Sequence, residues 1–171
     1  MPIIAKQTGS DFIPCPAGLH HAVCVDVVDL GKIKVSYGGK EPKEQHKIRI
    51  VWQTDEPIPE TGKPYIVQKR YTLSLSEKAT LRKDLESWRS KPLSTEELAG
   101  FDVEVLIGVN CQISVMHDTR DGSTYANVTS VVPPPKGTYK IGPRDYVRVK
   151  DRTDGGQRDD GYQASDEDIP F

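Results

Sequence analysis

In the first half of the chain, apolar and polar residues alternate as they do in β-strands. A segment with helical spacing of apolar residues follows, and the strand-like alternation then returns. Three extended runs come first and cover residues 19–37, 46–54 and 65–75. Leu81, Leu85 and Trp88 follow at i, i+4 and i+7, which is the spacing of one face of an amphipathic helix. Two further extended runs, 111–116 and 124–132, close the pattern. We therefore predict three strands, one helix and two more strands, in that order.

Local signals indicate where these elements begin and end. Ser74 and Ser76 are both candidate N-caps for the helix, which should end before Pro92. A second short helix is expected after Ser94, because Glu97 lies three residues later, as in a capping box. Asp121-Gly122 is typical of a tight hairpin turn between the last two strands.

This order of elements is that of an OB-fold, a five-stranded Greek-key barrel with one helix between strands 3 and 4. We expect a mainly β chain in which residues 1–135 form the barrel, with Trp52 and Trp88 in its core. Pro133-Pro134-Pro135 should stop the last strand, since proline cannot donate to a strand ladder. Other small barrels and an α+β sandwich remain open alternatives.

The remaining residues, 136–171, are expected to form a flexible linker and an acidic tail. Residues 136–158 hold seven Lys/Arg and three Asp, whereas the last 13 residues hold five acids and no base. From about residue 150 the chain is rich in Gly and Asp and poor in apolar residues, which predicts disorder. The alternating run 146–150 is ambiguous, because it fits either an added strand or a loose segment.

No pattern in the sequence indicates an enzyme, a metal site or a cofactor. The three cysteines form no C-x-x-C pair, so we expect small buried thiols. No P-loop, G-x-S-x-G or H-E-x-x-H motif occurs. The scattered carboxylates, for example Asp26, Asp29, Asp102 and Glu104, are expected to lie on the solvated surface.

Targeting signals are also lacking. No apolar run is long enough to span a membrane, and the first residues do not resemble a signal peptide. We therefore expect a cytoplasmic protein with no membrane partner.

The C-terminal residues Asp166-Glu167-Asp168-Ile169-Pro170-Phe171 are very similar to the tip that closes bacterial single-stranded DNA-binding proteins. The run from Tyr71 to Arg89 looks more like small DNA-binding proteins of bacteriophages and prophages. The resemblance implies an N-terminal OB-fold, a flexible linker and a tip that docks onto replication, recombination and repair proteins. It also implies a bacterial host cytoplasm if the chain is encoded by a phage.

The tip has a physical basis for docking that does not depend on the resemblance. Phe171 offers an apolar ring and an α-carboxylate together, which a pocket containing an Arg or Lys can capture. Pro170 restricts the backbone and so lowers the entropy lost on binding. Asp166, Glu167 and Asp168 add a field that favours a basic partner.

Binding of single-stranded DNA requires cations along the backbone path and rings on which bases stack. The candidates lie in the first three predicted strands, their loops and the last hairpin: Lys34, Tyr37, Lys40, Lys43, Lys47, Arg49, Lys69, Arg70, Tyr71 and Tyr125. Lys47 and Arg49 are preferred, because alternation points them away from the face that carries Ile48.

Two functions follow from these features. The first is binding of single-stranded DNA without strong sequence preference, with partner proteins recruited by the tip. The second is an adaptor without significant DNA binding, whose tail mimics the tip of the host's DNA-binding protein. Few phosphate contacts are available to one chain, so a homo-oligomer is left open.

Overall fold

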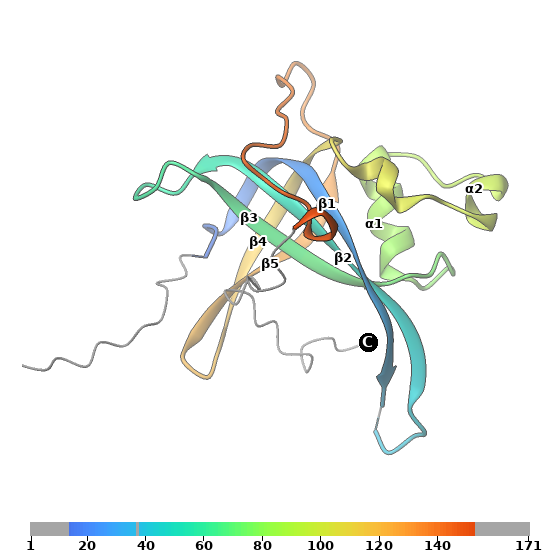
Figure 1. Cartoon of the computed structure of the whole chain (residues 1–171). Helices are drawn as coiled ribbons and strands as arrows, with labels where there is room; N and C mark the ends of the chain where they lie inside the picture. The colour runs from blue at the N-terminus through green and yellow to red at the C-terminus, as the bar shows by residue number, and fades with distance from the viewer. Residues whose placement is uncertain (1–13, 37, 153–171) are drawn as a thin grey trace, which may run out of the picture.

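The computed structural model describes residues 14–36 and 38–152, which form a mainly β structure (Figure 1). Its strands make one five-stranded antiparallel sheet in the order β3-β2-β1-β4-β5. The strands are β1 (Gly18–Val35), β2 (Lys43–Pro57), β3 (Pro64–Thr72), β4 (Asn110–Arg120) and β5 (Ser123–Val132). The helices are α1 (Thr80–Arg89), α2 (Thr95–Ala99) and the 3₁₀ turns η1 (Val103–Leu106) and η2 (Val149–Asp151). The predicted order of three strands, a helix and two strands is confirmed.

The long strand β1 bends the sheet, because it pairs with β4 at its start and with β2 along most of its length. Two irregularities in its pairing with β2, between Cys24 and Asp26 and between Asp29 and Gly31, allow this curvature. The edge strands β3 and β5 approach each other, and α1 contacts both. No hydrogen-bonded ladder joins β3 to β5 among the described residues, so the sheet is open there.

The inner face of the sheet holds the main core. Trp52 is fully buried and Trp88 is almost fully buried, and their ring centroids are 6.1 Å apart. The indole Nε1 of Trp88 donates to the Asn110 carbonyl at 2.9 Å, which joins α1 to the start of β4. Leu81 and Leu85, the other two residues of the predicted helical stripe, are also buried. The predicted core positions of both tryptophans are confirmed.

The start of α1 differs from its prediction. The helix begins at Thr80, and its N-cap residue is Ala79, which provides no side-chain cap. Ser74 and Ser76 lie in the turn that follows β3, because Leu73 still donates its N–H to His46 on β2. The capping box of α2 is as expected: Ser94 Oγ accepts from Glu97 N–H, and the Glu97 carboxylate accepts from Ser94 N–H.

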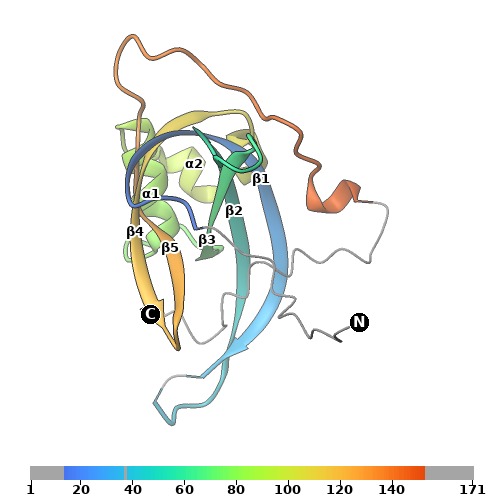
Figure 2. The ribbon, with the colours of Figure 1, turned by 90° about the vertical axis from the view of Figure 1, so that its left-hand side faces the viewer.

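The hairpin turn between β4 and β5 is also confirmed. Asp121 and Gly122 have φ angles of +48° and +78°, the left-handed values that a tight hairpin of this kind requires. The β1–β2 and β4–β5 hairpins point toward the same end of the molecule (Figures 1 and 2).

After β5 the chain crosses the outer face of the sheet, the face opposite the main core (Figure 2). We call residues 138–152 the strap. The strap adds no strand to the sheet, and within it η2 is the single helical turn that the structure describes. It covers a second apolar cluster formed by Val23, Val25 and Val51, against which Ile141 and Tyr146 pack. The sequence predicts disorder from about residue 150; residues 150–152 are described and belong in part to η2, and the rest of that tail lies outside the described part. No described helix is long and apolar enough to cross a membrane.

Candidate nucleic-acid interface

Three predicted cations meet on the outer face of β2 and β3. Alternation along β2 turns Lys47 and Arg49 away from the core residue Ile48, as expected. The register places Arg49 directly opposite Arg70 of β3. We call Lys47, Arg49 and Arg70 the outer basic cluster.

Lys47 lies beneath the surface of this cluster rather than on it. The residue is only 3% exposed, and its Nζ donates to Thr72 Oγ1 at 2.6 Å. Burial, and then the charge of Arg70, lower the pKa of Lys47 below its usual value. Lys47 is therefore the buried member of the cluster, while the half-buried Arg49 and Arg70 present their side chains closer to solvent.

The β1–β2 hairpin extends the positive surface beyond the sheet. Lys34, Lys40 and Lys43 are exposed there, and Lys43 shares the strand parity of Lys47 and Arg49. Lys32 lies 3.9 Å from Glu44, so the hairpin carries both signs of charge. Tyr37, another predicted DNA contact, lies outside the described residues.

Lys69 and Tyr71 do not join the outer cluster, and their prediction as surface contacts is corrected. Their parity on β3 is opposite to that of Arg70, so both turn toward α1. Tyr71 is 3% exposed, and its hydroxyl donates to Asp84 at 2.6 Å. Lys69 Nζ donates to the same carboxylate at 2.9 Å. The Tyr71 ring is therefore a core residue and offers no stacking surface. Burial and then Asp84 hold the pKa of Tyr71 well above its usual value.

Tyr125 lies on a different part of the sheet. It is half-buried on β5, opposite Asp118 in the β4–β5 hairpin. Asp118 also accepts from Arg120 Nε at 2.6 Å, so this hairpin holds its own ion pair. Tyr125 thus belongs to β5, whereas the outer basic cluster belongs to β2 and β3.

Two side-chain amides hold the first half of the strap against the sheet. Gln53 donates to the Arg144 carbonyl and accepts from the Arg144 N–H, both at 2.8 Å. Asn110 does the same for Ile141, with both hydrogen bonds at 2.9 Å. Each side-chain amide thus makes the two hydrogen bonds that a neighbouring strand would make. The backbone N–H and C=O groups of Arg144 and Ile141 are therefore paired although the strap forms no strand ladder.

A buried carboxylate holds the second half of the strap. Asp26 is 1% exposed; its Oδ1 accepts from Arg148 Nε at 3.0 Å, and its Oδ2 accepts from the Tyr146 hydroxyl at 3.0 Å. The backbone N–H of Val149 donates to the same Oδ2 at 2.9 Å. The expectation of a solvated Asp26 is wrong, because its partners come from the strap, about 120 residues further along the chain.

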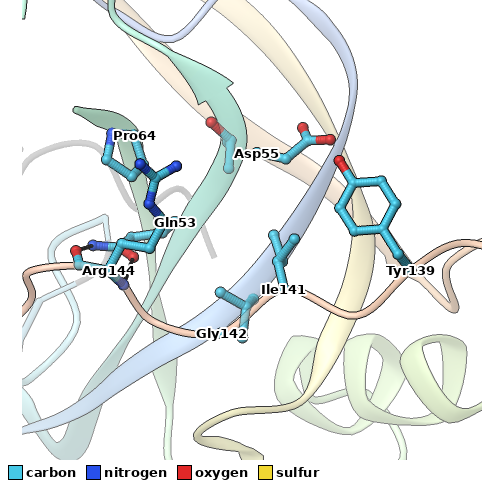
Figure 3. A pocket seen from close by; sticks show the side chains of 9 residues that line it. Gln53, Asp55, Pro64, Tyr139, Ile141, Gly142 and Arg144 are labelled. Atoms are coloured by element: carbon cyan, nitrogen blue, oxygen red, sulfur yellow. Dashed lines mark hydrogen bonds between the residues drawn. The ribbon is translucent and has the colours of Figure 1, made fainter. Parts of the chain in front are cut away.

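Between the first half of the strap and the sheet lies a small hollow of about 140 Å³ (Figure 3). Tyr139 borders one side of it and Arg144 the other, with Gln53 and Asp55 from β2 between them. Tyr139 is 66% exposed, and the edge-on ring of His21 packs against it at 5.7 Å between centroids. The hollow is too small for a drug-sized ligand.

Among the described residues, no group of three or more His, Cys, Asp or Glu side chains is placed to hold a metal ion. The predicted docking residues Asp166, Glu167, Asp168, Ile169, Pro170 and Phe171 lie outside the described part of the chain. No known family model matches this sequence, and no curated protein is similar enough to be matched to it.

Proposed function

We propose that this protein binds single-stranded DNA, without strong sequence preference, through the outer face of β2 and β3. The strand order, the approach of β3 to β5 and the position of α1 between β3 and β4 support an OB-fold identity. In such barrels the face of strands 2 and 3, with the loops 1–2 and 4–5, is the usual site for oligonucleotides. The role we propose is in DNA replication, recombination or repair.

The observation that carries the proposal is the pairing of Arg49 with Arg70 across two adjacent strands, with Lys47 buried beside them. Guanidinium groups match phosphate oxygens in a forked geometry, so two neighbouring arginines suit a phosphodiester backbone. Phosphate contacts position a strand but carry no sequence information. Such a site should therefore be indifferent to sequence and sensitive to salt.

The acidic segment Asp166–Phe171 completes the proposal as a docking element for replication and repair proteins. Its apolar Ile-Pro-Phe residues follow three acids, a composition that suits a basic partner surface with an apolar pocket. Deleting Phe171 should abolish partner docking and leave DNA binding in place.

A titration of a labelled oligo(dT) of roughly 30 nucleotides at low salt tests the DNA-binding proposal, by fluorescence anisotropy. Arg49→Gln and Arg70→Gln should each weaken binding by roughly tenfold, the effect of losing about 1.4 kcal/mol. Lys78→Gln is a matched loss of one charge, since Lys78 is exposed in the turn before α1. It should change the affinity less than about twofold.

Two results would contradict the proposal. Absence of binding by the wild-type protein at low salt would favour the adaptor function instead. Equal weakening by Lys78→Gln and by the two arginine variants would mean that net charge, and not the outer basic cluster, governs binding.

A further inference from the structure

We propose that the strap forms the second wall of the DNA site, with Arg152 continuing the outer basic cluster and Asp26 holding the strap in position. This inference rests on the proposed function. It adds a binding residue, Arg152, and a positioning residue, Asp26, that lie outside the β2–β3 face.

A chain of contacts connects Arg152 to the sheet. The Arg152 guanidinium lies over the Tyr146 ring, 5.6 Å from its centroid, and its Nε donates to the Val147 carbonyl at 3.2 Å. The Tyr146 hydroxyl donates to Asp26, which the β1–β2 register places opposite Val51. Val51 is two residues from Arg49, so on β2 the two side chains share the outer face.

Arg152 and Arg49 both act electrostatically on the same phenol, that of Tyr146. Burial, and then Asp26, raise the pKa of Tyr146 above its usual value, whereas Arg152 and Arg49 act to lower it. Both guanidinium groups are therefore within Coulombic reach of the Tyr146 oxygen. The proposed site takes Arg152, Arg49 and Arg70 as one row, from the strap across β2, where the register sets Arg49 opposite Arg70, to β3.

The charge pattern of the strap region fits this role. Residues 136–152 carry six Lys/Arg and two Asp. Two of those cations serve the fold: Arg148 contacts Asp26 and Glu104, and Lys150 Nζ lies 3.7 Å from Glu104. Arg152 is instead held over the Tyr146 ring, and in the proposed site its charge adds to the phosphate path.

Asp26 would repel a phosphate if its charge reached the surface, but the structure removes that charge from solvent. The carboxylate is 1% exposed, and it accepts hydrogen bonds from Arg148, Tyr146 and the Val149 backbone. Its contribution to DNA binding is therefore indirect, through the position of Tyr146 and Arg152.

The direction of one substitution separates this inference from simple electrostatics. Asp26→Asn removes an acid and raises the net charge by one, so long-range attraction alone predicts tighter DNA binding. If the strap merely covered the DNA site, loosening it would uncover the site, and the variant would again bind DNA more tightly. The second-wall inference predicts weaker binding, because a loosened strap no longer holds Arg152 in the row.

The experiment is an oligo(dT) anisotropy titration of the full chain at several salt concentrations. We expect Asp26→Asn to weaken binding by roughly tenfold, and Arg152→Gln by roughly fivefold with a salt slope shallower by about 0.7, one lost single-strand phosphate contact. Lys136→Gln, an exposed charge just before the strap, is the matched control and should stay within about twofold. Tyr146→Phe keeps the ring and the charge but loses the hydroxyl, and it should weaken binding in the same direction as Asp26→Asn.

Each outcome decides a separate question. Absence of binding by the wild-type protein contradicts the proposed function itself. If the wild-type protein binds through Arg49 and Arg70, the inference is overturned when Asp26→Asn binds equally or more tightly and Arg152→Gln behaves like Lys136→Gln. If circular dichroism shows that Asp26→Asn does not fold, Tyr146→Phe and Arg152→Gln decide the question alone.

Discussion

Replacing Asp26 by Asn should cost this fold much more stability than the same change at Asp29, three residues along the same strand. Asp26 is buried and joins the sheet to the strap through Tyr146, Arg148 and the backbone of Val149. Asn has nearly the same shape as Asp, so the change removes the charge and turns one acceptor into a donor. One side of the new amide must then face a donor from the strap.

The size of the effect follows from these contacts. Removing one partner of a buried ion pair typically costs about 3–5 kcal/mol, because the other charge stays behind. The Arg148 side chain is 21% exposed and keeps Glu104 at 3.1 Å, so we take the lower end, about 3 kcal/mol. With a urea m-value of about 2 kcal/mol/M for a domain of this size, the unfolding midpoint should fall by about 1.5 M.

Urea unfolding followed by tryptophan fluorescence measures this shift, since Trp52 and Trp88 both lie in the core. Asp29→Asn is the control: Asp29 is 69% exposed and pairs with His46 at 2.6 Å, so its loss should move the midpoint far less. Equal shifts for the two variants would refute the view that Asp26 anchors the strap. Faster hydrogen exchange at Val149 in Asp26→Asn would place the effect in the strap itself.

Three further predictions concern the rest of the fold. Burial raises the pKa of Cys24 to about 12, and the other two cysteines are buried as well, so a thiol reagent at about pH 8 should label the protein only after unfolding; rapid labelling of the native protein would contradict this. Tyr71→Phe should lower the free energy of unfolding by about 1 kcal/mol, for the lost hydroxyl contact, and leave oligo(dT) affinity unchanged, whereas weaker DNA binding would return this ring to the interface. The hydrogen bond from Arg89 lowers the pKa of Glu97 to about 2, below its unfolded value, so its stabilising effect is complete above the unfolded pKa and is lost as pH falls toward 2. Glu97→Gln should therefore lower the urea midpoint near pH 6 but not near pH 2, and a gap that persists in acid would refute this assignment.

Features that depend on local spacing could be predicted from the sequence. The period of apolar residues identified all five strands and α1, because side chains alternate on a strand and recur every three or four residues on a helix. Trp52 follows Ile48 and Ile50 at strand spacing, which is enough to place it inside. The turn at Asp121-Gly122 could be predicted because these two residue types favour the left-handed backbone angles that the turn requires.

The errors arise where a residue's role depends on neighbours that are distant in sequence. Ser74 and Ser76 have the composition of caps, but β3 reaches Thr72 and leaves them in a turn. Asp26 looks like any surface acid until the strap returns to cover it. The position of Tyr71 was available from alternation, since Tyr65 and Val67 at the same parity are also buried.

The central claim is that the row formed by Arg49, Arg70 and Arg152 holds a DNA backbone. The most direct test is the slope of log affinity for oligo(dT) against log salt concentration, measured for the wild-type protein and for the double variant Arg49→Gln/Arg70→Gln. Three single-strand phosphate contacts predict a wild-type slope of about −2 or steeper, and the loss of two contacts should make the slope shallower by about 1.4. An unchanged slope in the double variant, or absence of binding by the wild-type protein at the lowest salt concentration, would contradict the account.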